Sequence, residues 1–357
     1  MTGVVRYIAL SLLALSVSLA AVCQPIATWV SKVHDFGVFD EASGRQSCEM
    51  RVVNTGDAPL IISRVQPTCG CTAGDFPRSP IAPGDTAVIT LTYNPTNRAG
   101  QFEKDVYVYT NAMPARHVVK IRGNAIPTAS TLDKQYPVNI GGLRLSRQIL
   151  PLGEVQRTGF RLGYISGYNS THDTIVIHSR CDASWLRIDA IPDTVAPAGT
   201  VTLTMRLDGL DAPEWGLNTT DVAVEASKLD DEVVATGSIE VTGVVLDDFK
   251  RLTADSRANP PTLVVDDRIE TDSTGRGKMT VKNNGRGTLE IRRLWSDDPA
   301  LTLTVDRRNV SRGGKATINV TVDKQKINGE VLNTSFTVIT NDPERQVSTV
   351  RVVGILK

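Results

Sequence analysis

Residues 59–84 read PLIISRVQPTCGCTAGDFPRSPIAPG, and this stretch decides how the first part of the chain folds. Its beginning, Leu60–Val65, is rich in apolar and β-branched residues, which is typical of a strand. The sequence Cys69-Gly70-Cys71-Thr72 then predicts a tight turn, because glycine supplies the backbone freedom that such a turn needs. Pro83-Gly84 predicts a second turn that leads into a further strand. The stretch therefore predicts two strands with a cysteine-bearing loop between them.

Short runs in which apolar and polar residues alternate occur throughout the chain after residue 23. In Ala87–Tyr93 every second residue is apolar and the residues between them include threonines, and Cys48, Met50 and Val52 alternate with polar residues in the same way. Alternation with period two indicates strands with one buried face. No long stretch shows the helical period, so the sequence predicts an all-β protein.

Glycine-marked turns recur along the chain at similar spacings. Pro83-Gly84, Pro197-Ala198-Gly199 and Gly313-Gly314 each precede an alternating run. Each run is followed by an isolated glycine and then by two further runs that end in another glycine. The repeating unit of about 110 residues is the size of an immunoglobulin-like sandwich. We therefore expect three tandem immunoglobulin-like β-sandwich domains.

The repeat predicts the following division of the chain: a signal peptide at 1–23, an Ig-like domain with the CGCT motif at 24–126, a degenerate Ig-like domain at 127–246, a linker at 247–261 and an Ig-like domain at 262–357. The outer two units match in detail, because Asn54-Thr55-Gly56 corresponds to Asn283-Asn284-Gly285. The middle unit has longer expected loops.

The N-terminus has the features of an export signal. Arg6 precedes the unbroken apolar stretch Ile8–Val22, and Ser18-Leu19-Ala20 offers small residues for a signal peptidase. Cys23 is a candidate for lipid attachment, although Val22 is unusual before such a cysteine; cleavage to a soluble product is the alternative. No later stretch is long and apolar enough to predict a transmembrane span in the mature chain. We expect an exported protein.

Composition argues against several functions. The 39 basic and 39 acidic residues cancel, and no basic stripe predicts nucleic-acid binding. Four histidines supply few general bases or nitrogen ligands. No nucleophile elbow, metalloprotease motif, P-loop or dinucleotide fingerprint is present. The sequence therefore predicts that the protein is not an enzyme and has no cofactor.

The first unit resembles a known family at several motifs. They are Phe36-Gly37, Asn54-Thr55-Gly56, Pro59-Leu60, Cys69-Gly70-Cys71-Thr72, Pro83-Gly84, Gly100 and Gly123. Together they are similar to the exported bacterial Ig-like family catalogued as domain of unknown function 1573. The resemblance covers residues 30–125 closely and the third unit loosely, without its cysteines. It implies a seven-strand sandwich and export, and it implies no catalytic role.

Three interpretations of Cys69 and Cys71 remain open. They form a structural staple, by a bond to each other or from one of them to Cys48; they bind a soft metal such as Cu(I) or Zn(II); or they exchange electrons with other thiols. A metal site would need further ligands, for which His34 and His117 are the candidates in this unit. Cys181 is a remnant of the motif to which we assign no role.

These patterns predict an exported, non-enzymatic binding or scaffolding protein of the bacterial cell envelope, acting through protein–protein contacts of its Ig-like domains. The expected interaction loop contains Thr68, Gly70, Thr72 and Phe76. Its partners would be envelope or surface proteins, in the periplasm or at the outer membrane or cell surface of a Gram-negative bacterium. The alternative is a metal-binding or redox factor that acts through Cys69 and Cys71.

Overall fold

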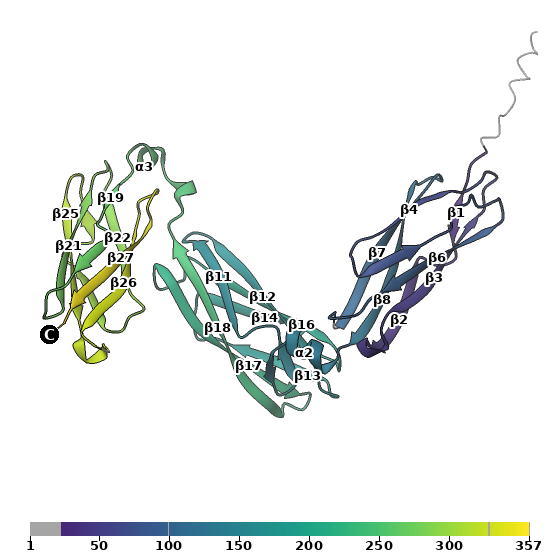
Figure 1. Ribbon diagram of the computed structural model, residues 1–357, viewed down its shortest axis with the longest axis horizontal. Helices are drawn as coiled ribbons and strands as arrows, with labels where there is room; N and C mark the ends of the chain where they lie inside the picture. Colours follow the sequence, from purple (N-terminus) through teal and green to yellow (C-terminus); the bar gives the residue numbers. More distant parts are fainter. Residues whose placement is uncertain (1–22, 99, 328, 357) are drawn as a thin grey trace, which may run out of the picture. The chain divides into compact units, whose positions relative to one another are not determined.

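The computed structural model of the protein describes residues 23–98, 100–327 and 329–356. The expected signal peptide therefore lies outside the described residues, except for Cys23. Strands dominate and the described helices are short, which confirms the all-β class (Figure 1). None of these helices combines the length and the apolar character that crossing a membrane requires. The chain forms two compact units, of which the first ends at Gln135 and the second begins at Tyr136.

The first unit contains one sandwich of two four-stranded sheets, called the first sandwich below. One sheet has the order β1-β3-β6-β5, with β1 at Ala27–Trp29, β3 at Gln46–Asn54, β6 at Thr86–Tyr93 and β5 at Thr72–Asp75. The other has the order β2-β8-β7-β4, with β2 at Val33–Asp40, β8 at Arg116–Ile126, β7 at Gly100–Thr110 and β4 at Ile62–Pro67. The 3-10 helix η1 (Glu41–Ser43) and helix α2 (Ala129–Gln135) complete the unit.

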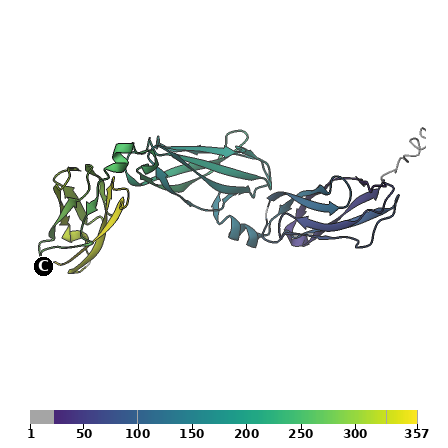
Figure 2. The same ribbon diagram turned by 90° about the horizontal axis from the view of Figure 1, so that it is seen from above.

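The second unit begins with the middle sandwich, whose strands are drawn in teal and green in Figure 2. It has two five-stranded sheets. One sheet has the order β14-β16-β12-β10-β9, with β14 at Leu186–Ile191, β16 at Thr200–Asp208, β12 at Phe160–Asn169, β10 at Leu143–Leu145 and β9 at Val138–Ile140. The other has the order β11-β18-β17-β13-β15, with β11 at Ile149–Gln156, β18 at Val233–Leu246, β17 at Gly216–Lys228, β13 at Ile175–Arg180 and β15 at Thr194–Val195.

The third sandwich follows a segment that contains η2 (Phe249–Arg251) and α3 (Ala254–Ala258). Its four-stranded sheet has the order β19-β21-β25-β23, with β19 at Leu263–Val264, β21 at Arg276–Asn283, β25 at Lys315–Val322 and β23 at Leu301–Val305. Its five-stranded sheet has the order β20-β27-β26-β22-β24, with β20 at Arg268–Glu270, β27 at Val347–Ile355, β26 at Val331–Thr340, β22 at Leu289–Trp295 and β24 at Asn309–Val310. η3 (Lys324–Lys326) follows β25.

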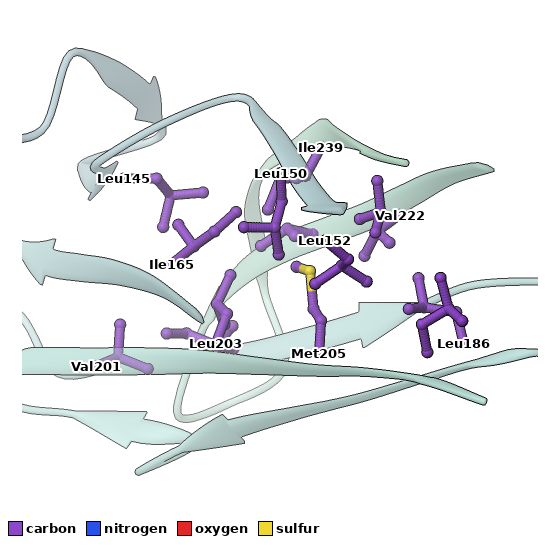
Figure 3. Packing of buried hydrophobic residues seen from close by; sticks show 14 of the residues in the cluster. Leu145, Leu150, Leu152, Ile165, Leu186, Val201, Leu203, Met205, Val222 and Ile239 are labelled. Carbon is purple, nitrogen blue, oxygen red and sulfur yellow. The ribbon is translucent and has the colours of Figure 1, made fainter. Parts of the chain in front are cut away.

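Each sandwich has its own hydrophobic core, built from the alternating runs. In β6, Ala87, Ile89, Leu91 and Tyr93 are buried, as the period of two predicts. Figure 3 shows the corresponding core of the middle sandwich, where Leu150 and Leu152 of β11 lie opposite Leu203 and Met205 of β16. The three cores are separate clusters of buried residues.

A strand near the start of each sandwich is split between its two sheets. β1 pairs antiparallel with β3, whereas β2 pairs parallel with β8. In the middle sandwich, β10 pairs antiparallel with β12 and β11 pairs parallel with β18. In the third sandwich, β19 pairs antiparallel with β21 and β20 pairs parallel with β27. Consequently β1, β10 and β19 cover only the C-terminal ends of β3, β12 and β21. The rest of each of these strands forms an open sheet edge.

A buried asparagine ends the equivalent strand in all three sandwiches. Asn54, Asn169 and Asn283 are the last residues of β3, β12 and β21, and each has 0% exposed surface. Each Nδ2 donates to two backbone carbonyls, one four residues ahead and one 26 or 27 residues ahead. Each Oδ1 accepts from the backbone N–H two residues ahead. The middle sandwich thus keeps the turn that the sequence showed only in the outer two.

Candidate functional site

The Cys-Gly-Cys-Thr motif forms the crossover between the two sheets of the first sandwich. β4 is an edge strand of one sheet and ends at Pro67, which is opposite Val106 of β7. β5 is an edge strand of the other sheet and begins at Thr72, which is opposite Tyr93 of β6. Residues 68–71, called the crossover loop below, therefore carry the chain from one sheet to the other along one edge of the sandwich.

A disulfide joins Cys69 and Cys71 inside the crossover loop, with the two Cα atoms 5.2 Å apart. The backbone N–H and the hydroxyl of Thr68 both donate to the carbonyl oxygen of Asp105 in β7, at 3.1 and 3.0 Å. The backbone N–H of Asn94, directly after β6, donates to the carbonyl oxygen of Cys71 at 2.8 Å. The loop is thus closed covalently and fixed to both sheets.

The residues of the expected interaction loop fall into two groups. Thr68 and Gly70 are exposed, and a side chain added at Gly70 would meet open space. Thr72 and Phe76 are buried, and the guanidinium carbon of Arg78 lies 3.9 Å from the ring centre of Phe76. A partner can therefore touch Thr68 and Gly70, whereas Thr72 and Phe76 support the loop from inside.

The crossover loop borders a hollow of about 290 Å³, whose other walls are Tyr93, Arg98, Gln101, Phe102 and Lys104. The rings of Tyr93 and Phe102 stack with their centres 3.9 Å apart and their planes at 14°. Burial raises the pKa of Tyr93, so its phenol stays neutral at physiological pH. Arg98 and Lys104 line the hollow beside these two rings, which are 1% and 9% exposed, so the hollow suits an anionic group next to a small apolar one.

Cys48 takes no part in the disulfide. It lies on β3 opposite Leu91 of β6, is buried, and is a free thiol. Burial raises the pKa of the Cys48 thiol to about 11, which keeps it protonated at neutral pH. Of the pairings considered from the sequence, the structure contains the one between Cys69 and Cys71.

The histidines considered as additional metal ligands lie on other strands. His34 is on β2, at the opposite edge of the sheet from β4. His117 is buried on β8, with Nε2 3.2 Å from the Thr110 hydroxyl and its ring centre 5.9 Å from that of Trp29. Across the ranges that the structure describes, no group of three or more His, Cys, Asp or Glu side chains could hold a metal ion.

Cys181 follows the strand of the middle sandwich that corresponds to β4. It comes directly after β13, which pairs with β17 as β4 pairs with β7. Its Sγ lies 3.5 Å from the hydroxyl of Thr220, and it is a free thiol. This position agrees with the interpretation of Cys181 as a remnant of the motif.

The stacked pair of Tyr93 and Phe102 was not identified from the sequence. Tyr93 was expected only as a core residue of its strand, and Phe102 lies at the start of β7 on the other sheet. Gly100 marks this region as a turn, but no local pattern shows that the two rings meet. The crossover loop could be located from its cysteines, whereas the hollow beside it could not.

The protein-family model described as "Protein of unknown function (DUF1573)" matches residues 27–125, which confirms the resemblance seen in the motifs. The crystal structure of a protein of unknown function from Porphyromonas gingivalis W83 is 19% identical, with 60% of this chain and 100% of that chain covered and a TM-score of 0.46. The periplasmic chaperone SfaE is 17% identical in sequence; the match covers 60% of this chain and 100% of the chaperone chain, with a TM-score of 0.26. The ASH/PapD-like domain of human CEP192 is 10% identical in sequence; the match covers 31% of this chain and 92% of that domain, with a TM-score of 0.27. No curated protein matches the chain.

Proposed function

We propose that this protein, in which residues 27–125 form a DUF1573 domain, is a non-enzymatic binding or scaffolding protein of the bacterial cell envelope. The observation that carries the proposal is the geometry of the crossover loop. Its disulfide and its hydrogen bonds to Asp105 and Asn94 hold Thr68 and Gly70 in one exposed conformation. A surface that is already ordered loses less conformational entropy when it binds.

The two strands that flank the crossover loop offer a route for binding. β4 and β5 are edge strands of different sheets at the same side of the first sandwich. An extended segment of a partner can add to such an edge through main-chain hydrogen bonds, and pockets for its side chains provide specificity. The hollow beside Gly70 is such a pocket, and Arg98 and Lys104 at its rim favour a segment with an acidic residue beside an apolar one.

The compartment is part of the same proposal. Disulfides persist in oxidising environments and are rare in the bacterial cytosol. The bond between Cys69 and Cys71, together with the signal-like N-terminal sequence, supports export to the periplasm or the outer surface. Attachment of lipid at Cys23 would keep the protein at a membrane face.

Thiol exchange is the second candidate function, and one observation favours it over metal binding. Cys69 and Cys71 are joined, and bonded sulfurs offer no thiolate to a metal ion. Cys69 is only half-buried and borders the hollow, so a partner dithiol could reach its sulfur. The partner's two thiols would be oxidised to a disulfide while the bond between Cys69 and Cys71 is reduced to two thiols.

Site-specific photo-crosslinking in the producing bacterium tests the binding proposal. A photoreactive residue at Gly70 should give defined adducts with one or a few envelope proteins, because this position faces open space on the crossover loop. The same residue at Glu49, which is exposed on β3 of the same sandwich, is the control and should not give these adducts. Equal adducts at both positions, or none at either, would reject the crossover loop as the contact surface.

A further inference from the structure

Half of β12 in the middle sandwich forms an open sheet edge. β12 pairs with β16 from Phe160 to Tyr168, but with β10 only at residues 167–169. Residues 160–165 have no strand partner on the β10 side among the described residues. This observation is independent of the crossover loop and of its proposed function.

The direction of the backbone groups along this edge follows from two hydrogen bonds. The carbonyl oxygen of Ser166 accepts from the N–H of Ser146, on the β10 side, and that of Gly159 accepts from the N–H of Gly209, which follows β16. Backbone groups of a strand alternate between its two neighbours. The N–H and C=O groups of the even-numbered residues 160, 162 and 164 therefore point out of the open edge.

The same three residues carry large apolar side chains on the outer face of the sheet. Phe160, Leu162 and Tyr164, called the β12 stripe below, are 55%, 42% and 54% exposed. The guanidinium carbon of Arg206 lies 4.3 Å from the ring centre of Phe160 and orients that ring. An open edge next to a row of apolar side chains is a site at which another strand can add.

The other two sandwiches provide a comparison within the same chain. Counting back from the buried asparagines, the positions equivalent to Phe160, Leu162 and Tyr164 are Arg45, Ser47 and Glu49 in the first sandwich and Thr274, Arg276 and Lys278 in the third. All six side chains are polar, and all are exposed. Charged residues on an edge are a common protection against strand addition. At these three outer positions the edge of the middle sandwich lacks this protection, and Arg161 between them lies on the inner side, where its Nε donates to the carbonyl oxygen of Leu152.

We propose that the β12 stripe is the interface with a second copy of this chain, with the two β12 strands paired antiparallel about Leu162. In this register Leu162 lies opposite Leu162 of the second copy, and Phe160 lies opposite its Tyr164. The outward-pointing N–H and C=O groups of each copy then meet those of the other, so all three residue pairs form hydrogen bonds. Aromatic and apolar cross-strand pairs add to the stability of such a contact.

The inner positions of β12 are compatible with this register. Arg161 would lie opposite Gly163 of the second copy, so a long side chain faces a residue that has none. Because the register pairs the stripe with itself, the contact has two-fold symmetry and closes as a dimer. The β12 stripe of a second copy offers the apolar side chains and the outward-pointing backbone groups with which this edge can pair, so a second copy is the occupant.

Sedimentation of residues 24–357 at increasing protein concentration tests the proposal. We expect a monomer–dimer equilibrium in the wild type. Leu162→Lys would place two like charges opposite each other and weaken the dimer at least about tenfold. Leu229→Lys, at an apolar residue that is 69% exposed in the β17–β18 turn, is the matched control and should leave the equilibrium unchanged. A wild type that stays monomeric at every concentration would overturn the proposal.

Cysteine crosslinking tests the register independently of stability. Opposed residues in a hydrogen-bonded pair have Cα atoms about 5.5 Å apart, which suits a disulfide. Leu162→Cys should therefore crosslink to itself between two copies under mild oxidation. Tyr164→Cys is the control, because its two copies would lie about 13 Å apart along the strands and cannot bond. Equal crosslinking of both variants, or none of Leu162→Cys, would contradict pairing about Leu162.

Discussion

The side-chain amide of Asn54 donates a hydrogen bond to the carbonyl oxygen of Ile81, 3.0 Å away, and ties the end of β3 to the turn before β6. Asn54 also donates to Ala58 and accepts from the N–H of Gly56. One buried side chain thus hydrogen-bonds to three backbone groups around the turn, and the carbonyl oxygen of Ile81 also accepts from the N–H of Leu60. Because Asn169 and Asn283 repeat these bonds, the asparagine defines the repeating unit structurally.

Replacing Asn54 should destabilise the first sandwich strongly. Asn54→Ala would remove the donor of the Ala58 carbonyl oxygen and one of the two donors of the Ile81 carbonyl oxygen, which keeps the N–H of Leu60, at a cost of about 1–3 kcal/mol in the free energy of unfolding. Urea unfolding of the variant measures the loss. Ser79→Ala, at an exposed loop position, is the control and should change stability by less than about 0.5 kcal/mol. Equal unfolding midpoints for the two variants would contradict this role.

The four cysteines of residues 24–357 should differ in reactivity. In the folded chain of residues 24–357, Cys181 is the one partly exposed free thiol, because Cys69 and Cys71 are bonded and the pKa of buried Cys48 is raised to about 11. Intact-mass spectrometry after alkylation at neutral pH should show one label, a second at half-buried Cys69 after mild reduction, and four after unfolding in denaturant, because Cys71 is buried like Cys48. Labelling of Cys69 and Cys71 without reduction would show that the disulfide is not the resting state.

Glu41 should make the stability of the first unit depend on pH. Its carboxylate accepts from the backbone N–H groups of Asn97 and Thr128, at 2.6 and 2.9 Å, and from the hydroxyl of Thr131 at 2.8 Å. Burial raises the pKa of Glu41, but these hydrogen bonds lower it by more, so the net shift is downward. A lowered folded-state pKa gives stability that is present above the unfolded value and is lost as the pH falls through the folded one.

The matching variant is Glu41→Gln, which keeps the size of the side chain and removes its charge. At neutral pH it should destabilise the unit by about 1–3 kcal/mol, because hydrogen bonds to a charged group are the stronger ones. Urea unfolding from neutral pH down to about pH 3.5 should show this difference shrinking as Glu41 becomes protonated in the wild type. A difference that is constant with pH would show that the carboxylate charge is not involved.

Local patterns in the sequence predicted a large part of the fold. The alternation in Ala87–Tyr93 indicates a strand by itself, since the side of the sheet to which each side chain points depends only on its position along the strand. The Asn-Thr-Gly sequence at Asn54 indicates a turn, because the hydrogen bonds that the Asn54 side chain makes there reach only two and four residues along the chain. The cysteine spacing located the crossover loop, although it left open which two sulfurs bond.

Contacts between distant residues could not be predicted in this way. Glu41 meets Thr131, 90 residues later, only because both lie at the same end of the first sandwich. The inward direction of Thr72 depends on where β5 joins its sheet, so the sequence placed it in the expected interaction loop although it is buried. The open half of β12 depends on where the chain leaves β10 for the other sheet, and no local pattern fixes that point.

The most direct test of the central claim is photo-crosslinking from Gly70 in the native envelope, compared between the wild type and a Cys69→Ser/Cys71→Ser variant. Loss of a bond that closes so short a loop should lower stability by only about 1–2 kcal/mol, so the variant should stay folded. The account predicts discrete adducts with envelope proteins in the wild type and at least about fivefold weaker adducts in the variant, because the loop is no longer held in one conformation. Adducts of equal strength in a folded variant, or none in the wild type, would contradict it.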